Sequence, residues 1–272
     1  MSRYALAVDV GATKVALAKV DRSFEVTSKH EIFVKENHNL WEEIAAVTQE
    51  LFEEADCSFI GVGIGSAGPL HLSTGAISPV NIPVWRQFPI VEKFTELTDT
   101  RNVVLHGDAM ALAHAEFRLG AGRGVSNMLG LVVSTGIGGG LVLNDELYIG
   151  ESGNAYFIGH HTVNFDGIDC ACGRRGCVET YASGPRMVEI AQSRGWKGDP
   201  SFIALADTAR QGNATALEVI DEGARALAIG IVNSLGSLDI QTVVIGGGVS
   251  QAGDVYWNPL RFHVKNEARF TD

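Results

Sequence analysis

The chain has 272 residues, of which 46% are hydrophobic, and a formal net charge of −11. This length allows one large core or two medium ones, and the negative charge argues against nucleic acid as a partner, because binding to phosphate backbones rests on lysine and arginine. The sequence shows neither a signal peptide nor a run of about 18 apolar residues, so we expect a cytoplasmic protein without a membrane partner.

The first third of the chain alternates short apolar runs with turns. Two apolar runs flank residues 11–14, which predicts a β-hairpin. Leu40, Ile44 and Leu51 follow helical spacing with acidic residues between them, which indicates an amphipathic helix. In chain order we predict strands at 4–10 and 15–20, a third strand at 25–34, a helix at 40–54, a strand at 59–65 and a loop at 65–69.

The middle of the chain repeats the opening pattern of strand, glycine turn and strand. An apolar run at 128–134 precedes a glycine-rich turn at 135–140 and a second run at 141–144. Two such units about 120 residues apart favour a duplicated fold, although two unrelated hairpins would give the same pattern. The other elements that we predict are a strand at 103–108 followed by a helix to Phe117, helices at 178–194, 202–210 and 214–235, and a strand at 242–246.

Asp9 lies at the end of the first strand, one residue before the first turn. Backbone N–H groups of a glycine turn can approach a phosphate, and a nearby carboxylate can hold the water shell of Mg²⁺. The turn at 135–140 offers a second phosphate site of the same kind. Together the two turns indicate an ATP that is clamped between two lobes.

Three cysteines, Cys170, Cys172 and Cys177, lie close together, and the fourth cysteine of the chain stands alone. An odd and tight cluster favours metal ligands over disulfides, and with one histidine it would form a closed, structural Zn²⁺ site. His160 and His161 compete for the fourth position. The alternative is a surface loop with free thiols, which would be open to oxidation.

These landmarks, in this order, resemble the ROK group of bacterial repressors, open reading frames and kinases. The resemblance rests on the opening Asp-x-Gly-x-Thr-Lys, the Thr-Gly-x-Gly-Gly-Gly turn, and Gly-His followed by Cys-x-Cys-Gly-x-x-Gly-Cys-x-Glu. It runs from Tyr4 to about Leu260, and the cysteine segment is its specific part. It implies an α/β protein with a duplicated, ribonuclease-H-like fold of the actin and hexokinase type. The implied lobes are residues 1–107 and 108–272, with a zinc loop at 160–177.

The resemblance also implies an activity, the ATP-dependent phosphorylation of a hexose or an N-acyl hexosamine. Asp108 matches the general base that takes the proton of the sugar hydroxyl, although as the N-cap of a helix that starts at Ala109 it would have a structural role only. ATP, Mg²⁺ and zinc are the implied cofactors, His160 is favoured over His161 as a zinc ligand, and we expect a homodimer. The implied ATP-binding residues are Asp9, Gly11, Thr13, Lys14, Thr135, Gly136, Gly138, Gly247 and Gly248, and the implied sugar-binding residues are Gly68, Asn81, Asp108, His160 and Glu179.

The chain departs from the family pattern at two positions of the implied sugar site. Family kinases usually carry Asn-Asp at the base and Glu-x-Gly-His before the zinc loop, whereas this chain has Gly107 and Phe157 in place of the Asn and the Glu. Both changes remove groups that would bond sugar hydroxyls, which predicts weak binding of a plain hexose. The substrate then carries an apolar or N-acyl group, or the chain is a catalytically weak sugar-binding or regulatory protein without a DNA-binding domain. Relatives also usually continue past residue 272 with a strand and a final helix.

Overall fold

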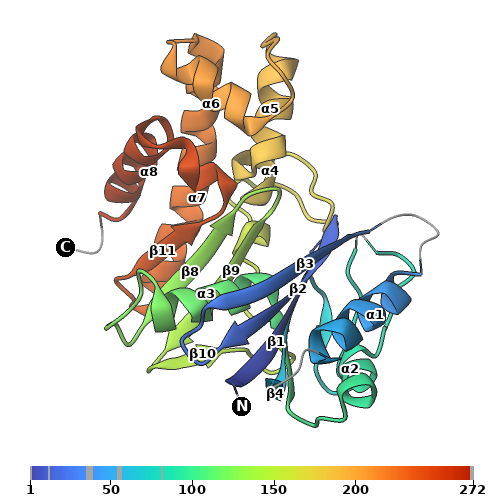
Figure 1. Ribbon diagram of the computed structural model, residues 1–272. Coiled ribbons are helices and arrows are strands. Elements are labelled where there is room, and N and C mark those ends of the chain that lie inside the picture. The colour runs from blue at the N-terminus through green and yellow to red at the C-terminus, as the bar shows by residue number, and fades with distance from the viewer. Residues whose placement is uncertain (1, 12, 35–38, 54–56, 81, 270–272) are drawn as a thin grey trace. The chain divides into compact units, whose positions relative to one another are not determined.

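The computed structural model describes residues 2–11, 13–34, 39–53, 57–80 and 82–269. It is an α/β structure in which the chain forms two compact units (Figure 1). The first unit comprises residues 1–111 and 149–155, and the second comprises residues 112–148 and 156–272. Each unit has its own sheet and its own hydrophobic core.

The first unit is built on a five-stranded sheet of order β3-β2-β1-β4-β7. β1 and β2 form an antiparallel hairpin that pairs Val10 with Val15, which confirms the predicted hairpin. β4 lies parallel to β1, and β7 lies parallel to β4. The strands are β1 (Ser2–Val10), β2 (Lys14–Asp21), β3 (Val26–Phe33), β4 (Cys57–Ser66) and β7 (Val103–Gly107).

Alternating apolar side chains form the core of the first unit. Along β2, Val15 and Leu17 are fully buried and the residues beside them are partly exposed, as expected of a strand with one buried face. Helices α1 (Leu40–Glu53) and α2 (Ile90–Thr98) add Ile44 and Phe94 to this core. A small sheet of β5 (Leu70–His71) and β6 (Ala76–Ile77) completes the unit.

The segment 149–155 belongs to the first unit although it follows β10 in the chain. Its Asn154 side chain accepts a hydrogen bond from the Leu70 N–H and donates one to the Leu70 carbonyl, both at 2.9 Å. The side-chain amide thus pairs with both backbone groups of Leu70, as a neighbouring strand would. These two bonds hold the segment 149–155 against β5.

The second unit is built on a four-stranded sheet of order β10-β9-β8-β11. β8 and β9 form an antiparallel hairpin, and β11 lies parallel to β8. The predicted turn at 135–140 is wrong in its extent: it comprises residues 134–136, because Gly138 and the two glycines after it pair with β8 as part of β9. A Cβ at Gly139 would press on Ile158 and Tyr156, so glycine suits this strand. The strands are β8 (Met128–Val133), β9 (Ile137–Leu143), β10 (Glu146–Tyr148) and β11 (Val243–Gly246).

Helix α7 (Ala214–Leu238) is the central helix of the second unit and packs against its neighbours α4, α5, α6 and α8 (Figure 1). Asn213 caps it by accepting a hydrogen bond from the Ala216 N–H. The helix predicted at 178–194 is instead two helices, because Ser183 is extended (φ −74°, ψ 150°). The other helices are α3 (Asp108–Leu119), α4 (Glu179–Ala182), α5 (Gly184–Ser193), α6 (Phe202–Arg210), α8 (Asp254–Glu267) and the 3₁₀ turns η1 (Ile158–His160) and η2 (Gly248–Ala252).

None of these helices, within the residues described, is both long and apolar enough to cross a membrane.

Candidate active site and metal site

Asp9 and Asp108 stand at the same edge of the first unit's sheet. Asp9 pairs with Gly65 of β4, and Gly107, next to Asp108, pairs with Ser66 of the same strand. Because β1, β4 and β7 run parallel, their carboxyl ends meet at this edge, where open α/β sheets commonly bind ligands. The structure therefore brings the predicted Mg²⁺ carboxylate and the predicted general base close together.

The negative charge of Asp108 affects the protonation of Asp9 at this edge. Partial burial and the negative charge of Asp108 raise the pKa of the Asp9 carboxyl, against an opposing effect of Lys14 and Lys29. Asp108 is exposed, and its Oδ1 accepts a 2.7 Å hydrogen bond from the Ala109 N–H at the start of α3. A cation at this edge would offset the repulsion between the two carboxylates.

The turn between β1 and β2 holds three predicted ATP-binding residues. A 3.0 Å hydrogen bond from the Gly11 N–H to the Lys14 carbonyl closes it, and Thr13 lies exposed within it. The Lys14 ammonium pairs with Glu31 at 2.7 Å, and Lys29 pairs with the same carboxylate. These two ammonium groups lower the pKa of Glu31 to about 2. A phosphate would therefore compete with Glu31 for the charge of Lys14.

Gly68, a predicted sugar-binding residue, lies in the loop between β4 and β5. This loop is joined to the first strand by a 3.1 Å hydrogen bond from the Ala67 N–H to the Val10 carbonyl. Gly68 thus lies near the strand end that carries Asp9. Asn81, the other residue predicted from this part of the chain, lies outside the described residues.

In the second unit, the turn at 134–136 and the glycines after β11 lie at one end of the sheet. β8 and β11 are parallel neighbours, and a side chain on Gly247 would overlap the Val133 backbone. A Cβ on Gly248 would lie 3.8 Å from the Ser134 hydroxyl. The structure thus brings together four predicted ATP-binding residues, Thr135, Gly136, Gly247 and Gly248, whereas Gly138 lies within β9.

The four predicted metal ligands, His160, Cys170, Cys172 and Cys177, converge in the second unit with all their ligand atoms within 4.8 Å of one another. Sγ of Cys170 is 3.6 Å from Nδ1 of His160, and Sγ of Cys172 is 3.7 Å from Sγ of Cys177. A tetrahedral Zn²⁺ ion, with bonds of about 2.3 Å to sulfur and about 2.1 Å to nitrogen, separates its ligands by about 3.6–3.8 Å. These two separations therefore fit a tetrahedral metal ion.

The loop between the cysteines folds tightly enough to bring them together. Gly173 and Gly176 have positive φ values (83° and 66°), and a Cβ at Gly176 would overlap the Asn164 carbonyl. Hydrogen bonds from the Cys170 N–H to the Arg174 carbonyl (2.8 Å) and from the Gly173 N–H to the Cys170 carbonyl (3.0 Å) close the turn. The glycines of the motif are thus required by backbone geometry.

The thiols of the cluster differ in their affinity for protons. Burial opposes ionisation of Cys172, but hydrogen bonds from the Arg174 backbone and from the other two thiols lower its pKa. Burial, together with the neighbouring Cys170 and Cys172, raises the pKa of Cys177 to about 12. A bound metal cation would favour the thiolate form of every ligand cysteine.

The two candidate histidines have different surroundings. His160 joins the cysteines through Nδ1, which leaves its Nε2 for another partner. The ring of His161 instead packs edge-on against Tyr156 at 5.5 Å, and burial, with a further contribution from Arg174, lowers its pKa. Phe157 is 48% exposed, with its ring centroid 6.3 Å from that of His160. The Phe157 ring is therefore accessible to solvent.

Glu179 begins α4, two residues after Cys177, and is half-buried. Its Oε2 accepts a 2.7 Å hydrogen bond from the Ile137 N–H. The carboxylate that was predicted to bind sugar thus also contacts the residue that follows the turn at 134–136.

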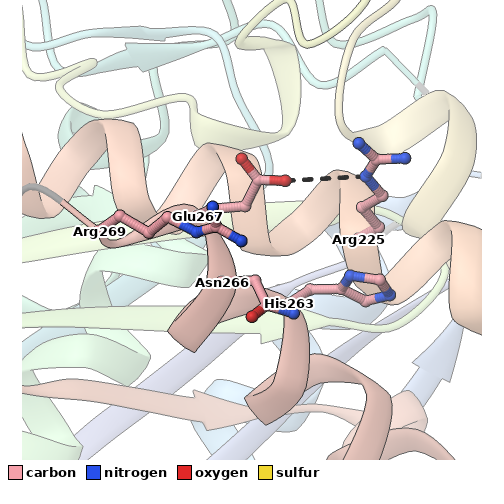
Figure 2. A pocket seen from close by; sticks show the side chains of 5 residues that line it. All are labelled: Arg225, His263, Asn266, Glu267 and Arg269. Atoms are coloured by element: carbon pink, nitrogen blue, oxygen red, sulfur yellow. Dashed lines mark ion pairs between the residues drawn. The ribbon is translucent and has the colours of Figure 1, made fainter.

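A cavity of about 490 Å³ opens elsewhere in the second unit, beside the end of α8 (Figure 2). Arg225 and Glu267 pair there at 3.7 Å, and His263 bonds Asp221 at 2.9 Å. The cavity contains no residue of the predicted site. Its lining side chains Arg225, Glu267 and His263 already have partners in the chain. The lining residues are Arg225, His263, Asn266, Glu267 and Arg269.

Comparison with known proteins identifies the family. The sequence profile of the ROK family matches residues 5–270, nearly the whole chain. The chain belongs to the ROK family. This confirms the resemblance that the motifs indicated.

This ROK protein is similar to sugar kinases along most of its length. It is 34% identical to a glucokinase of Halalkalibacterium halodurans, over 96% of this chain and 85% of that protein. It is 36% identical to an N-acetylmannosamine kinase of Yersinia pestis, over 91% of this chain and 83% of that protein. Its fold matches the solved ROK family glucokinase from Streptomyces griseus in complex with glucose and AMPPNP, with a TM-score of 0.81, 29% identity and coverage of 98% of this chain and 90% of that one.

One residue beside the ROK protein's candidate metal site, Arg174, was not singled out in the sequence. Its guanidinium donates hydrogen bonds to the His160 carbonyl (3.0 Å) and to the Thr162 hydroxyl (3.1 Å). It thereby fixes the histidine segment against the cysteine loop. The only signal for it is its place between the second and third cysteines, where a long basic side chain can reach back across the loop.

Proposed function

We propose that this sugar kinase transfers the γ-phosphoryl group of ATP to a hydroxyl of a hexose or an N-acyl hexosamine, a glucose-like or N-acetylmannosamine-like sugar. The observation that carries the proposal is the meeting of Asp9 and Asp108 at the carboxyl edge of three parallel strands. The relatives named glucokinase and N-acetylmannosamine kinase support the substrate class. The glucose and AMPPNP complex of the Streptomyces griseus protein supports a sugar and ATP as the two substrates.

Asp108 is the general base in this proposal. The sugar oxygen forms a bond to the γ-phosphorus while the bond from that phosphorus to the bridging oxygen of ADP breaks, and Asp108 accepts the hydroxyl proton. A carboxylate suits this task because phosphoryl transfer needs an oriented nucleophile more than it needs covalent catalysis. The exposure of Asp108 at the sheet edge supports this role.

The ATP site combines one carboxylate with backbone turns. Asp9 would hold the water shell of Mg²⁺, and that cation, when bound, neutralises charge on the phosphates. Lys14 would add positive charge, shared with Glu31. Backbone N–H groups of the two turns would receive the phosphates. We assign the phosphates to Gly11, Thr13, Thr135, Gly136 and Gly138, and the adenosine end to Gly247 and Gly248.

We assign Zn²⁺ to the cluster of His160, Cys170, Cys172 and Cys177. The four donors fill a tetrahedron and leave no open position for a substrate, so the role is structural. The fit of the sulfur and nitrogen separations to tetrahedral geometry supports this assignment.

The surroundings of His160 support a sugar with an apolar or N-acyl group. Nε2 of His160 and the carboxylate of Glu179 would bond sugar hydroxyls, and we assign Gly68 and Asn81 to the same sugar. Phe157 offers an exposed ring where a carboxylate would accept a hydrogen bond. A plain hexose would leave one hydroxyl unpaired at that ring, whereas an acyl group would pack on it.

A sugar-binding regulatory protein with little catalysis is the second candidate, and the same two residues, Gly107 and Phe157, favour it. A coupled assay of ADP release over a panel of hexoses and N-acyl hexosamines separates the two functions. Turnover with one sugar supports the kinase. Sugar binding in a calorimeter without ADP release from any sugar supports the regulatory protein.

A further inference from the structure

The turn at 134–136 is held from outside its hairpin by two consecutive helices. Glu179, the first residue of α4, accepts the 2.7 Å hydrogen bond from the Ile137 N–H on one side of the turn. On the other side, the Ser134 carbonyl accepts a 2.9 Å bond from the N–H of Gly184, the first residue of α5. Both ends of the turn are therefore fixed to one short segment of the chain.

The bond to Ile137 matters because this residue is buried. Ile137 is only 6% exposed, so its N–H would be costly to leave without an acceptor. A carboxylate acceptor makes the bond charge-assisted, which strengthens it relative to a neutral bond. In the described part of the chain Glu179 forms no ion pair that would draw its carboxylate elsewhere.

Gly136 shows how closely the carboxylate approaches the turn. A Cβ built on Gly136 would lie 2.8 Å from Oε2 of Glu179, closer than side chains pack. A residue with a side chain at this position would push the carboxylate away from the Ile137 N–H. The hydrogen bond of Glu179 to the turn therefore requires a residue without a side chain at position 136.

The start of α4 is hydrogen-bonded to the segment that carries the candidate metal ligands. Cys177 is fully buried, and its carbonyl accepts hydrogen bonds from the N–H (3.1 Å) and the hydroxyl (2.7 Å) of Thr180. The Val178 N–H donates to the His161 carbonyl at 2.9 Å. The Glu179 carboxylate is therefore presented to the turn from a buried, hydrogen-bonded stretch of backbone.

We propose that Glu179 is a positioning residue for the nucleotide, which holds the 134–136 turn in the form that receives phosphate, in addition to its proposed contact with the sugar. One carboxylate oxygen serves the turn and the other is left for the sugar, so one side chain couples the two substrates. The inference rests on the proposed kinase function, because the turn is assigned to phosphate there.

Nucleotide binding without sugar isolates this role. We expect Glu179→Ala to weaken binding of Mg²⁺·AMPPNP, measured by calorimetry without sugar, by about tenfold or more, because a buried N–H loses a charged acceptor. Glu179→Gln should stay within about threefold of wild type, because its amide oxygen can still accept from Ile137. Glu218→Ala removes a surface glutamate of α7 and serves as the matched control. Equal affinities of Glu179→Ala and wild type would overturn the proposal.

Amide hydrogen exchange separates failure of this inference from failure of the kinase proposal. The Ile137 N–H should exchange slowly in the wild type and at least about tenfold faster in Glu179→Ala, with or without nucleotide. A wild-type protein that binds no AMPPNP would contradict the kinase proposal, whereas the exchange experiment tests the bond itself. Unchanged exchange at Ile137 in Glu179→Ala would overturn the positioning role in either case.

Discussion

At the scale of single residues, Asp108 accepts one hydrogen bond from the Ala109 N–H and otherwise faces solvent. Asp108→Asn keeps the shape of the side chain and an oxygen for that bond, but the amide cannot take a proton. We expect kcat to fall about 10²–10⁴-fold, with nucleotide affinity and metal content close to unchanged. Steady-state kinetics with metal analysis check this. A loss below about tenfold would assign the proton transfer to another group.

Asp9 is expected to lower the stability of the folded protein at neutral pH. Its raised pKa means that the folded protein holds this proton more tightly than the unfolded chain does. The contribution of Asp9 to stability is therefore greatest below the ordinary value of 3.8 and falls as pH rises through 3.8 toward the raised pKa. At neutral pH, without Mg²⁺ or ATP, we expect Asp9→Asn to raise Tm by about 2 °C and to abolish turnover. The rise in Tm should vanish at pH 3, and a variant that melts lower at pH 7 would contradict this reading.

In the proposed sugar site, Phe157 and Gly107 are the two residues expected to weaken the binding of a plain hexose. The exposure of Phe157 means that a carboxylate placed there would stay in water, and a Cβ on Gly107 would make only ordinary contact with Met110 at 3.8 Å. We expect Phe157→Glu combined with Gly107→Asn to raise kcat/KM for glucose by about tenfold or more, with little change in Tm. Kinetics and a melting curve on the same sample test this. No gain in activity with an unchanged Tm would contradict the account of the sugar site.

At the scale of elements, the cysteine loop has the most direct chemical test. We expect about one zinc per chain in protein purified without chelator, because three thiolates and one imidazole complete a tetrahedron. Cys172→Ser should lower both zinc content and Tm, since metal binding contributes to folding. Cys57→Ser, at the cysteine that stands apart in the sequence, is the control. Zinc near zero in folded, reduced wild-type protein would overturn the assignment.

Several elements could be predicted because their pattern is local. The hairpin of β1 and β2 follows from two apolar runs around a turn, and α6 and α7 begin after capping residues, Ser201 and Asn213. The break at Ser183 and the pairing of Gly138 in β9 could not be predicted, because packing partners far along the chain decide them. The pattern of α8 is obscured by Pro259, which usually ends a helix.

The residues of the candidate site likewise fall into those that the sequence predicts and those that only the folded chain reveals. The cysteine motif and the Gly-His before it indicated all four candidate metal ligands, and the structure brings these residues together. Arg174 and the bond from Ile137 to Glu179 were not predicted, because both depend on contacts between segments that the sequence spacing does not relate. Spacing within a motif indicates the ligands, whereas the groups that position them become visible only in the folded chain.

At the scale of the whole molecule, both sheets contain a hairpin whose first strand has a parallel neighbour, β4 beside β1 and β11 beside β8. This shared arrangement is what a duplicated ribonuclease-H-like fold would produce, and the duplication, the lobe boundary at residue 107 and the homodimer stay predictions. The negative charge of −11 agrees with a protein that meets its anionic substrate through backbone N–H groups and a cation.

Release of ADP is the measurement that tests the central claim most directly. In a coupled assay with Mg²⁺, ATP and a panel of hexoses and N-acyl hexosamines, the account predicts sugar-dependent ADP release, greater with an N-acyl hexosamine than with glucose. Asp108→Asn should lose that release while it still binds the nucleotide. Zinc-replete, folded protein that binds ATP and a sugar but releases no ADP with any member of the panel would contradict the kinase.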